Sequence, residues 1–487
     1  MSGEDPLSST KNADDQQKST PSGKIRRALG LSFLNTVFGR IGTFLTGILL
    51  ARMLVPEDFG AFAVALVALG ALLAINELGV SLALVRWPGD PREIAPTVTT
   101  ISFLSSCVLY ALCWVGAPAF SEALGAPGAT GVVRLLCASV LIDGATAAAA
   151  QFVNREFRQG TRLTVDMSNL ALTTGVTVAL ALADYGAWSL AWGRLVGNAL
   201  SAVLLFRLVS MWPKPGFDRK QARELVAFGL PLAGASLLVF AMLNVDYVIT
   251  GHLLGAVALG LYLQAFNLAS WPVNMFSVVI RRVSLAAFAR VQDDPVAREA
   301  LLARFTALLF AGALPVCGLL GLLALPTVTT LYGAKWAGSA AALQFLVVLG
   351  IVRVATELGY DFLVALGLPG RTLWLQGIWL TALITLLPAG ALLDGIRGVA
   401  AAHALVAVLL VLPAFTYAVC RTGVRARVLG AAVVRPLVGA ALLTAVVLTV
   451  RWYTEPSLTQ LLLGGVLGGG VYLAVVWPMR GLVKQLG

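Results

Sequence analysis

Charged residues are scarce in this sequence. Only 12% of its 487 residues are Asp, Glu, Lys or Arg, whereas a soluble domain carries roughly a quarter. Hydrophobic residues make up 58% of the chain and recur in long continuous runs. Runs of about 20 apolar residues without alternation favour transmembrane helices over the strands of a membrane barrel. The composition therefore predicts an all-α integral membrane protein with no large water-soluble domain.

Several features of enzymes and metalloproteins are also missing. The five cysteines all fall in apolar runs and form no CxxC pair, which indicates buried free thiols. No Walker A sequence is present, so the chain is not expected to hydrolyse ATP. The net charge is +11, but the basic residues do not form a separate basic domain, which argues against a nucleic-acid partner. We therefore expect no catalytic residue, no metal and no cofactor.

The apolar runs predict about fourteen transmembrane helices. Residues 1–27 are polar and charged, and we expect a disordered tail there, followed by a first helix that acts as an uncleaved targeting signal. The predicted helices are 28–54, 59–84, 95–118, 131–153, 161–183, 187–208, 225–252, 256–280, 303–330, 339–366, 371–393, 398–420, 429–450 and 458–477.

The distribution of positive charge orients this map. Of the 35 Lys and Arg residues, 27 fall on the side of the N-terminal tail and three (Lys335, Arg397 and Arg451) on the opposite side. Cytoplasmic loops carry the excess of Lys and Arg in membrane proteins, so both termini are predicted to be cytoplasmic. The predicted external loops are short, which disfavours a membrane glycan polymerase or ligase.

The sequence contains a weak internal repeat. At an offset of 200, Gly60 matches Gly260, and Phe62 resembles Tyr262, in two predicted outward-facing turns. A second pair of similar segments begins at Asp184 and at Asp394. A repeat of six helices enters the membrane twice in the same direction, which gives two parallel lobes around a cavity. The expected parts are an N-terminal lobe (28–210), a cytoplasmic linker (211–224), a C-terminal lobe (225–420), and helices 13 and 14 with a short tail (421–487).

Some arginines lie inside the predicted helices. Arg52 lies at an outer helix end, where its side chain is expected to reach the membrane surface. An arginine at the bilayer centre costs at least a few kcal/mol, so it must pair or face water. A guanidinium group matches phosphate oxygens in a bidentate way and stays charged. We therefore predict that cavity arginines bind a phosphate or pyrophosphate; the candidates are Arg40, Arg194, Arg353 and Arg134.

Acidic residues also occur at membrane depth. Glu357 follows Arg353 by one helical turn, which is compatible with either an intrahelical ion pair or a wet cavity wall. Asp246 has no cation within a turn of its own helix, so we expect it to pair across the cavity or to bind a coupling proton or sodium ion. Asp143 is a further candidate for charge pairing. His403 is left out of the predicted site, because a lone histidine on a small-residue helix is more often a packed polar residue.

Several segments with a distinctive order run through the chain. They are LLARMLVPEDFGAFAVA (49–65), ELGVSLALVR (77–86), YGAWSLAWGRL (185–195), WPKPGFDRKQARELVAFGLP (212–231), DYVITGHLLGAVALGLYLQAFNLASWP (246–272), FARVQDD (288–294) and LYGAKWAGSA (331–340). On these segments the chain resembles the polysaccharide-transport (Wzx-like) flippases of the MOP exporter superfamily, and it looks most similar to exporters of colanic or teichuronic acid type. It departs from the family pattern between Ser284 and Ala287, where a proline is often found.

The resemblance implies a V-shaped pair of six-helix bundles with two extra helices. It implies that the chain turns an undecaprenyl-pyrophosphate-linked oligosaccharide from the inner to the outer leaflet of the bacterial cytoplasmic membrane for cell-surface polysaccharide synthesis. The expected partners are this lipid-linked sugar, membrane lipids and a polysaccharide polymerase of the same pathway. Asp246 falls where the family commonly has an aspartate in helix 7. The alternatives are a lipid II flippase or cation-coupled drug antiporter of the same superfamily, a membrane glycan polymerase or ligase, and a scaffold without transport activity.

Overall fold

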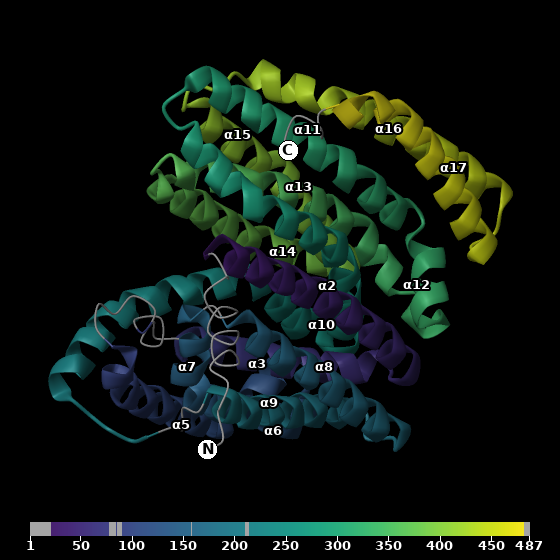
Figure 1. Cartoon of the computed structure of the whole chain (residues 1–487). Coiled ribbons are helices and arrows are strands. Elements are labelled where there is room, and N and C mark those ends of the chain that lie inside the picture. Colours follow the sequence, from purple (N-terminus) through teal and green to yellow (C-terminus); the bar gives the residue numbers. More distant parts are fainter. Residues whose placement is uncertain (1–20, 77–83, 85–89, 157, 210–213, 482–487) are drawn as a thin grey trace, which may run out of the picture. The chain divides into compact units, whose positions relative to one another are not determined.

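The computed structural model describes residues 21–76, 84, 90–156, 158–209 and 214–481 (Figure 1). Every regular element in these ranges is a helix. The chain divides into two compact units. Unit 1 comprises Met1–Gly47, Ala68–Val115 and Arg134–Leu237, and unit 2 comprises Ile48–Val67, Gly116–Val133 and Leu238–Gly487. The all-helical fold class predicted from the sequence is confirmed.

Five helices contribute residues to both units because the unit boundaries fall within them. These helices are α2 (Pro21–Met53), α3 (Pro56–Asn76), α5 (Pro91–Ala123), α6 (Thr130–Cys137) and α10 (Arg219–Arg290). Helix α2 begins inside the range expected to be the disordered tail.

Unit 1 also contains α7 (Ser139–Arg155), α8 (Gln159–Leu182) and α9 (Ala187–Val209). Helices α8 and α9 pack closely because α9 presents glycines to α8: Gly193 lies against Thr177, and Gly197 against Thr173. A hydrogen bond also joins the two helices: Asn169 Nδ2 donates to Ser201 Oγ at 2.7 Å. Small residues at such crossings are typical of helix packing in membranes.

The remaining long helices belong to unit 2. Helices α16 and α17 pack on each other and along α11, as the yellow and teal ribbons of Figure 1 show. Their interface is built on Leu323, Leu443 and Tyr472, which are almost completely buried. The helices are α11 (Pro295–Leu322), α12 (Ala324–Tyr332), α13 (Ser339–Ala365), α14 (Pro369–Val406), α15 (Leu412–Cys420), α16 (Ala426–Tyr453) and α17 (Leu458–Val476).

Two of the long helices each contain a sharp break. Helix α10 is interrupted at Gly255, whose φ of 81° and ψ of 179° are accessible to glycine at no steric cost. Helix α14 is interrupted at Asp394 and Gly395, with a φ of 54° at the glycine. Both breaks fall where the sequence predicts a turn between two membrane helices. After its break, α10 continues to Arg290 without another residue of non-helical backbone conformation, so the helix is uninterrupted near Ser284, where the family proline is missing.

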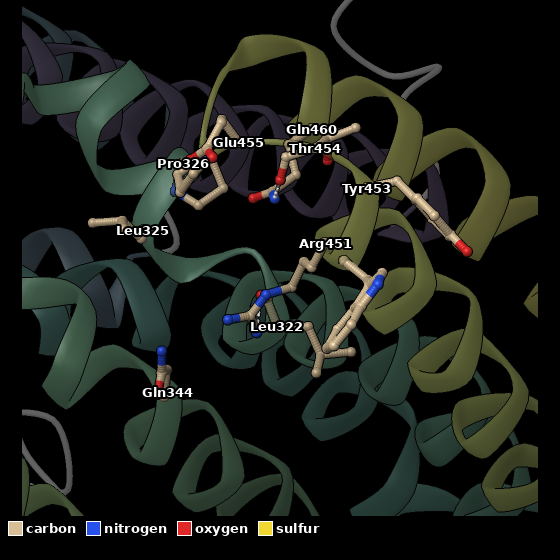
Figure 2. A pocket seen from close by; sticks show the side chains of 11 residues that line it. Leu322, Leu325, Pro326, Gln344, Arg451, Tyr453, Thr454, Glu455 and Gln460 are labelled. Carbon is tan, nitrogen blue, oxygen red and sulfur yellow. Dashed lines mark hydrogen bonds between the residues drawn. The ribbon is translucent and has the colours of Figure 1, made fainter.

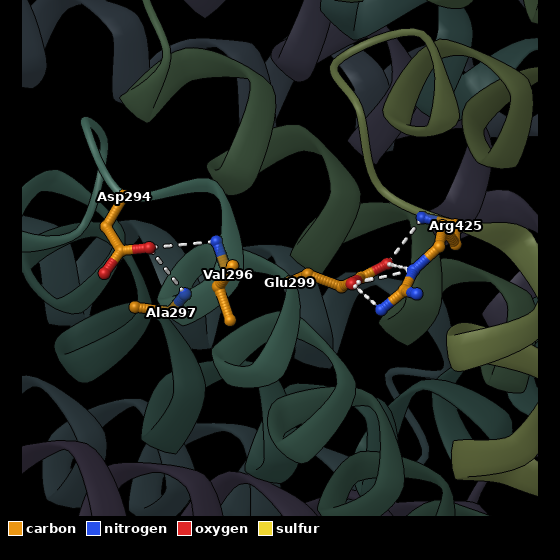
Figure 3. A network of polar contacts seen from close by, with 5 residues as sticks. All are labelled: Asp294, Val296, Ala297, Glu299 and Arg425. Atoms are coloured by element: carbon orange, nitrogen blue, oxygen red, sulfur yellow. Dashed lines mark hydrogen bonds and ion pairs between the residues drawn. The ribbon is translucent and has the colours of Figure 1, made fainter.

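Helix α11 begins with a defined cap. The carboxylate of Asp294 accepts hydrogen bonds from Val296 N at 2.9 Å and Ala297 N at 3.0 Å, and Pro295 occupies the first helical position (Figure 3). One turn later, Glu299 forms an ion pair with Arg425, with a shortest N–O distance of 2.7 Å. This contact ties the start of α11 to the loop before α16, and its hydrogen bonds raise the pKa of Arg425.

Among the described residues, eleven helical segments are long and apolar enough to cross a membrane. Two of them, Ser236–Met275 and Pro369–Cys420, have 40 and 52 residues and include the breaks at Gly255 and Asp394–Gly395. The chain is therefore a multi-pass membrane protein. The count of fourteen crossings, the orientation of the termini and the domain boundaries stay predictions.

Candidate substrate cavity

Unit 2 contains a cavity of about 600 Å³. It is lined by side chains of α10, α13, α14 and α15, so it lies between helices of one unit. Charged groups come from α13, and amide and imidazole groups come from α14. Aromatic rings complete the lining. The polar and aromatic residues are Phe266, Arg353, Thr356, Glu357, Tyr360, Asp361, Gln376, Trp379, His403 and Phe415. A cavity with a few convergent polar groups in an aromatic setting is typical of a ligand site.

The charged side chains of this cavity share one face of α13. Arg353, Glu357 and Asp361 are spaced by four residues, and all three line the cavity, as their helical spacing predicts. The Arg353 guanidinium lies 5.9 Å from the centre of the Phe266 ring, a cation–π contact with α10. Asp361 Oδ2 accepts a hydrogen bond from Ser284 Oγ at 2.8 Å. The lining thus combines one guanidinium with two carboxylates.

A buried polar group lies beside the cavity. Asp246 on α10 is 1% exposed, and its Oδ2 accepts a hydrogen bond from the Tyr262 hydroxyl at 2.9 Å. His403 Nδ1, from α14, lies 3.7 Å from the same oxygen and has no hydrogen-bond partner among the described residues. His403 also lines the cavity, so this histidine connects the cavity with the buried carboxylate. Asp246, Tyr262 and His403 are called the buried triad below.

The helix that carries His403 has an irregular backbone nearby. Residues Ala407–Val411 form one π-helical turn, which joins α14 to α15. Such turns occur frequently at functional sites because the extra residue leaves a weak point in the helical hydrogen bonding. The π-helical turn begins one helical turn after His403 and leads into α15, which contributes Phe415 to the cavity.

The other predicted site residues lie in unit 1. Arg194 on α9 is half-buried and interacts electrostatically with Asp143 on α7. The charge pairing of Asp143 stays a prediction. Arg40 is half-buried on α2. Arg134 contacts a neighbouring helix. Its Nε donates to the Trp114 carbonyl at 3.0 Å, and its guanidinium lies 4.6 Å from the centre of the Trp114 ring. Arg134 thus has a local structural partner on α5.

Sequence reasoning missed three residues of this region. Tyr262 occurs in the internal repeat, but nothing in its position shows that its hydroxyl reaches Asp246. The sequence indicates a packed polar residue at His403; the structure shows that it is buried and that its Nδ1 lies 3.7 Å from Asp246 Oδ2. Trp379 on α14 lines the cavity, and its buried Nε1 has no hydrogen-bond partner among the described residues. An unpaired buried donor at a cavity wall is a signal that only coordinates reveal.

A smaller pocket of about 300 Å³ lies where α11 and α16 end and α17 begins (Figure 2). Two of its polar side chains donate to backbone carbonyls. Arg451 Nη1 donates to the Leu322 carbonyl at 3.0 Å, and Gln460 Nε2 donates to the Thr454 carbonyl at 2.8 Å. The first contact joins the end of α16 to the end of α11, and the second closes the turn between α16 and α17. No group of three or more His, Cys, Asp or Glu side chains in the described ranges is arranged to hold a metal ion.

Comparison with known proteins identifies the family. A family described as polysaccharide biosynthesis protein matches residues 49–341. This chain belongs to that family. Among curated relatives, the chain is 27% identical over 316 residues to the succinoglycan biosynthesis transport protein ExoT of Rhizobium meliloti, covering 64% of this chain and 63% of the relative. It is 25% identical over 317 residues to the lipopolysaccharide biosynthesis protein WzxC of Escherichia coli, covering 62% of each chain.

The matched regions therefore span slightly less than two thirds of these relatives. Solved structures show the same fold more completely. The lipid II flippase MurJ in an inward closed conformation superposes with a TM-score of 0.78 at 15% identity, covering 93% of this chain and 100% of that one. A multidrug resistance MATE transporter of the MOP superfamily has a TM-score of 0.63 at 16% identity, covering 79% and 94%. The family member described here thus has a MurJ- and MATE-like fold.

Proposed function

We propose that this chain is a flippase that moves an undecaprenyl-pyrophosphate-linked oligosaccharide from the inner to the outer leaflet of the bacterial cytoplasmic membrane. The observation that carries the proposal is the cavity of about 600 Å³ in unit 2, with a guanidinium, carboxylates and aromatic rings on its wall. Family membership and the names of the relatives, which concern biosynthesis and transport of surface polysaccharides, support the same substrate class.

The groups of this cavity suit the two chemical parts of such a headgroup. Arg353 is a donor for a pyrophosphate oxygen, because its fork of N–H groups matches phosphate geometry. Glu357 offers acceptors, and Gln376 a donor and an acceptor, to sugar hydroxyl groups. The rings of Tyr360 and Trp379 provide apolar faces. In this scheme the prenyl chain stays in the lipid, where its apolar surface is most stable.

The buried triad is our candidate for energy coupling. Asp246 is enclosed in unit 2, and His403 joins it to the cavity. A proton or sodium ion bound at Asp246 would neutralise a charge that is costly at membrane depth. Binding would change the contact between Asp246 on α10 and His403 on α14, which makes the packing of these two helices depend on the ion.

The test is transport by purified protein in liposomes. A fluorescent undecaprenyl-pyrophosphate oligosaccharide is placed in one leaflet, and its appearance in the other leaflet is followed by quenching. Wild-type protein should accelerate the transfer, and Arg353→Ala should reduce the rate at least tenfold, because a charge-assisted contact contributes roughly 1.5–3 kcal/mol. Arg397→Ala is the matched control, since Arg397 is exposed and pairs with Asp394 away from the cavity.

Equal rates in wild type and Arg353→Ala would remove Arg353 from the site. An unchanged leaflet distribution with wild-type protein would contradict the flippase proposal itself. Chemical analysis of the same liposomes addresses the enzyme alternative: a lengthened or transferred glycan would indicate a polymerase or ligase. Arg40, Arg194 and Arg134 stay predicted pyrophosphate contacts. Substitution of each alone, and of Arg40 together with Arg353, tests them in the same assay.

The cellular setting is part of the proposal. We place both termini in the cytoplasm, because Lys and Arg are concentrated on that side of the predicted topology. A polysaccharide polymerase on the outer face is the expected consumer of the translocated lipid-linked sugar.

A further inference from the structure

A second pocket of unit 2 lies at the helix ends on the side predicted to be cytoplasmic. It has a volume of about 480 Å³ and is formed at the start of α11, the end of α13, the start of α14 and the end of α15. Three arginines line it together with a single carboxylate and two leucines. The lining residues used below are Asp293, Arg298, Leu366, Leu368, Arg371 and Arg421. None of them lines the substrate cavity.

One of the three arginines is held in a fixed orientation. Arg298 Nη2 donates to the Thr422 carbonyl at 2.7 Å, and Nη1 donates to the Gln292 carbonyl at 3.2 Å. Its Nε is buried and has no acceptor among the described residues. Arg298 is therefore preorganised, since its two carbonyl contacts fix the guanidinium before any ligand arrives.

The other two arginines have guanidinium groups that donate no hydrogen bond within the described structure. Arg371 lies in the first turn of α14, at the positive dipole end of that helix. Arg421 follows α15, and its guanidinium lies 5.5 Å from the centre of the Tyr417 ring. Both side chains are exposed and line the pocket. With Arg298 they outnumber the carboxylate of Asp293 by three to one.

Membrane topology alone does not explain why these three arginines converge on one pocket. The cytoplasmic excess of Lys and Arg orients a membrane protein, but it does not require that residues from three separate elements converge on one pocket. An anion that accepts several charge-assisted hydrogen bonds at once fits this convergence, and phosphate has the geometry for it. Leu366 and Leu368 supply an apolar wall in the same pocket. Phosphate next to an apolar wall at a helix end is the chemistry of a phospholipid headgroup.

We propose that this pocket binds the phosphate headgroup of an anionic phospholipid from the membrane leaflet. Basic pockets between transmembrane helices at this membrane surface commonly take such headgroups. The bound phosphate would connect Arg298 on α11, Arg371 on α14 and Arg421 after α15. Anionic lipid would thereby stabilise the cytoplasmic helix ends of unit 2. The proposal does not depend on the transported substrate.

The experiment is native mass spectrometry of the full-length purified protein, titrated with phosphatidylglycerol or with phosphatidylcholine of identical acyl chains. Wild-type protein should bind the first phosphatidylglycerol at least about tenfold more tightly than phosphatidylcholine, since each arginine near the surface contributes appreciably to anionic-lipid binding. The variant Arg371→Gln with Arg421→Gln should lose this preference. Arg298 is left intact because its backbone contacts also hold the fold.

The matched control is Arg290→Gln with Arg427→Gln, which removes two exposed arginines of the same unit that do not line the pocket. It should keep the preference for phosphatidylglycerol. If both double variants lose the preference for phosphatidylglycerol equally, the preference depends on general surface charge and the proposal is overturned. A pocket variant that melts at the wild-type temperature and still prefers phosphatidylglycerol would overturn it as well. Binding of soluble glycerol phosphate as tight as that of the lipid would show that the ligand is a free phosphate ester.

Discussion

Gly60 and Gly260 face each other at a helix crossing of unit 2. A Cβ atom on Gly260 would lie 2.8 Å from Gly60 N and would clash with the carbonyl of Pro56, while a Cβ on Gly60 would clash with the carbonyl of Ala256. The contact of Gly60 with residue 256 and the contact of Gly260 with residue 56 are equivalent in the repeat, because its two copies are offset by 200 residues. The crossing therefore has the local symmetry expected of the internal repeat, with equivalent segments of both copies in direct contact.

This crossing predicts a specific sensitivity to added volume. Gly60→Ala or Gly260→Ala should destabilise the protein by roughly 1–3 kcal/mol, because the new methyl group meets rigid backbone atoms. The measurement is thermal unfolding of the purified protein in detergent. Gly465→Ala is the control, since nothing lies within 4 Å of a Cβ at that position on α17. A similar loss of stability in the Gly465 variant would contradict the steric explanation.

A fully buried tryptophan closes the same region. Trp336 Nε1 donates to the Ala51 carbonyl at 2.7 Å, and its ring contacts Phe59 edge-on with centroids 5.1 Å apart. Trp336→Phe keeps an aromatic ring but leaves the carbonyl without its donor, at a cost of about 1–3 kcal/mol. Amide hydrogen exchange in residues 48–60 should become faster. Trp452→Phe, at a position 85% exposed, should leave that exchange unchanged.

The buried triad predicts separate effects on coupling and on binding. Asp246→Asn should abolish the stimulation of transport by an imposed proton or sodium gradient, because the variant lacks the carboxylate that would bind the coupling ion. Binding of substrate should be largely kept, since Asp246 is not among the residues that line the cavity. Tyr262→Phe removes one hydrogen bond to Asp246 and should weaken the stimulation less. The measurements are gradient-driven transfer and equilibrium substrate binding in liposomes, and full gradient stimulation in Asp246→Asn would refute the coupling role.

The cap of α11 gives a prediction independent of function. Asp294→Ala removes the acceptor of Val296 N and Ala297 N and should cost about 1 kcal/mol. Asp294→Asn should be nearly neutral, since an asparagine side-chain oxygen caps equally well. Thermal unfolding and hydrogen exchange at the start of α11 measure both effects. Equal destabilisation by the two substitutions would indicate that the charge of Asp294, and not its acceptor oxygen, stabilises the helix.

Local chemistry was sufficient to predict much of the architecture. Long apolar runs must become helices in hydrocarbon, because only a helix satisfies its own backbone groups there. Glycine permits the turn at Gly255, and the pair Asp394–Gly395 does the same in α14. The spacing of Arg353, Glu357 and Asp361 placed them on one face of a helix because the helical period alone determines this.

What the sequence by itself determined was thus the helical membrane class, the main breaks and the shared face of α13, all of which depend on neighbouring residues. Only the tertiary structure decided which polar groups meet. His403 reaches Asp246 because α14 packs beside α10, and Arg134 is engaged by Trp114 because α6 lies beside α5. Any charge buried in the membrane is costly unless it has a partner. The sequence shows that a partner is needed, but only the packing of the helices determines which residue it is.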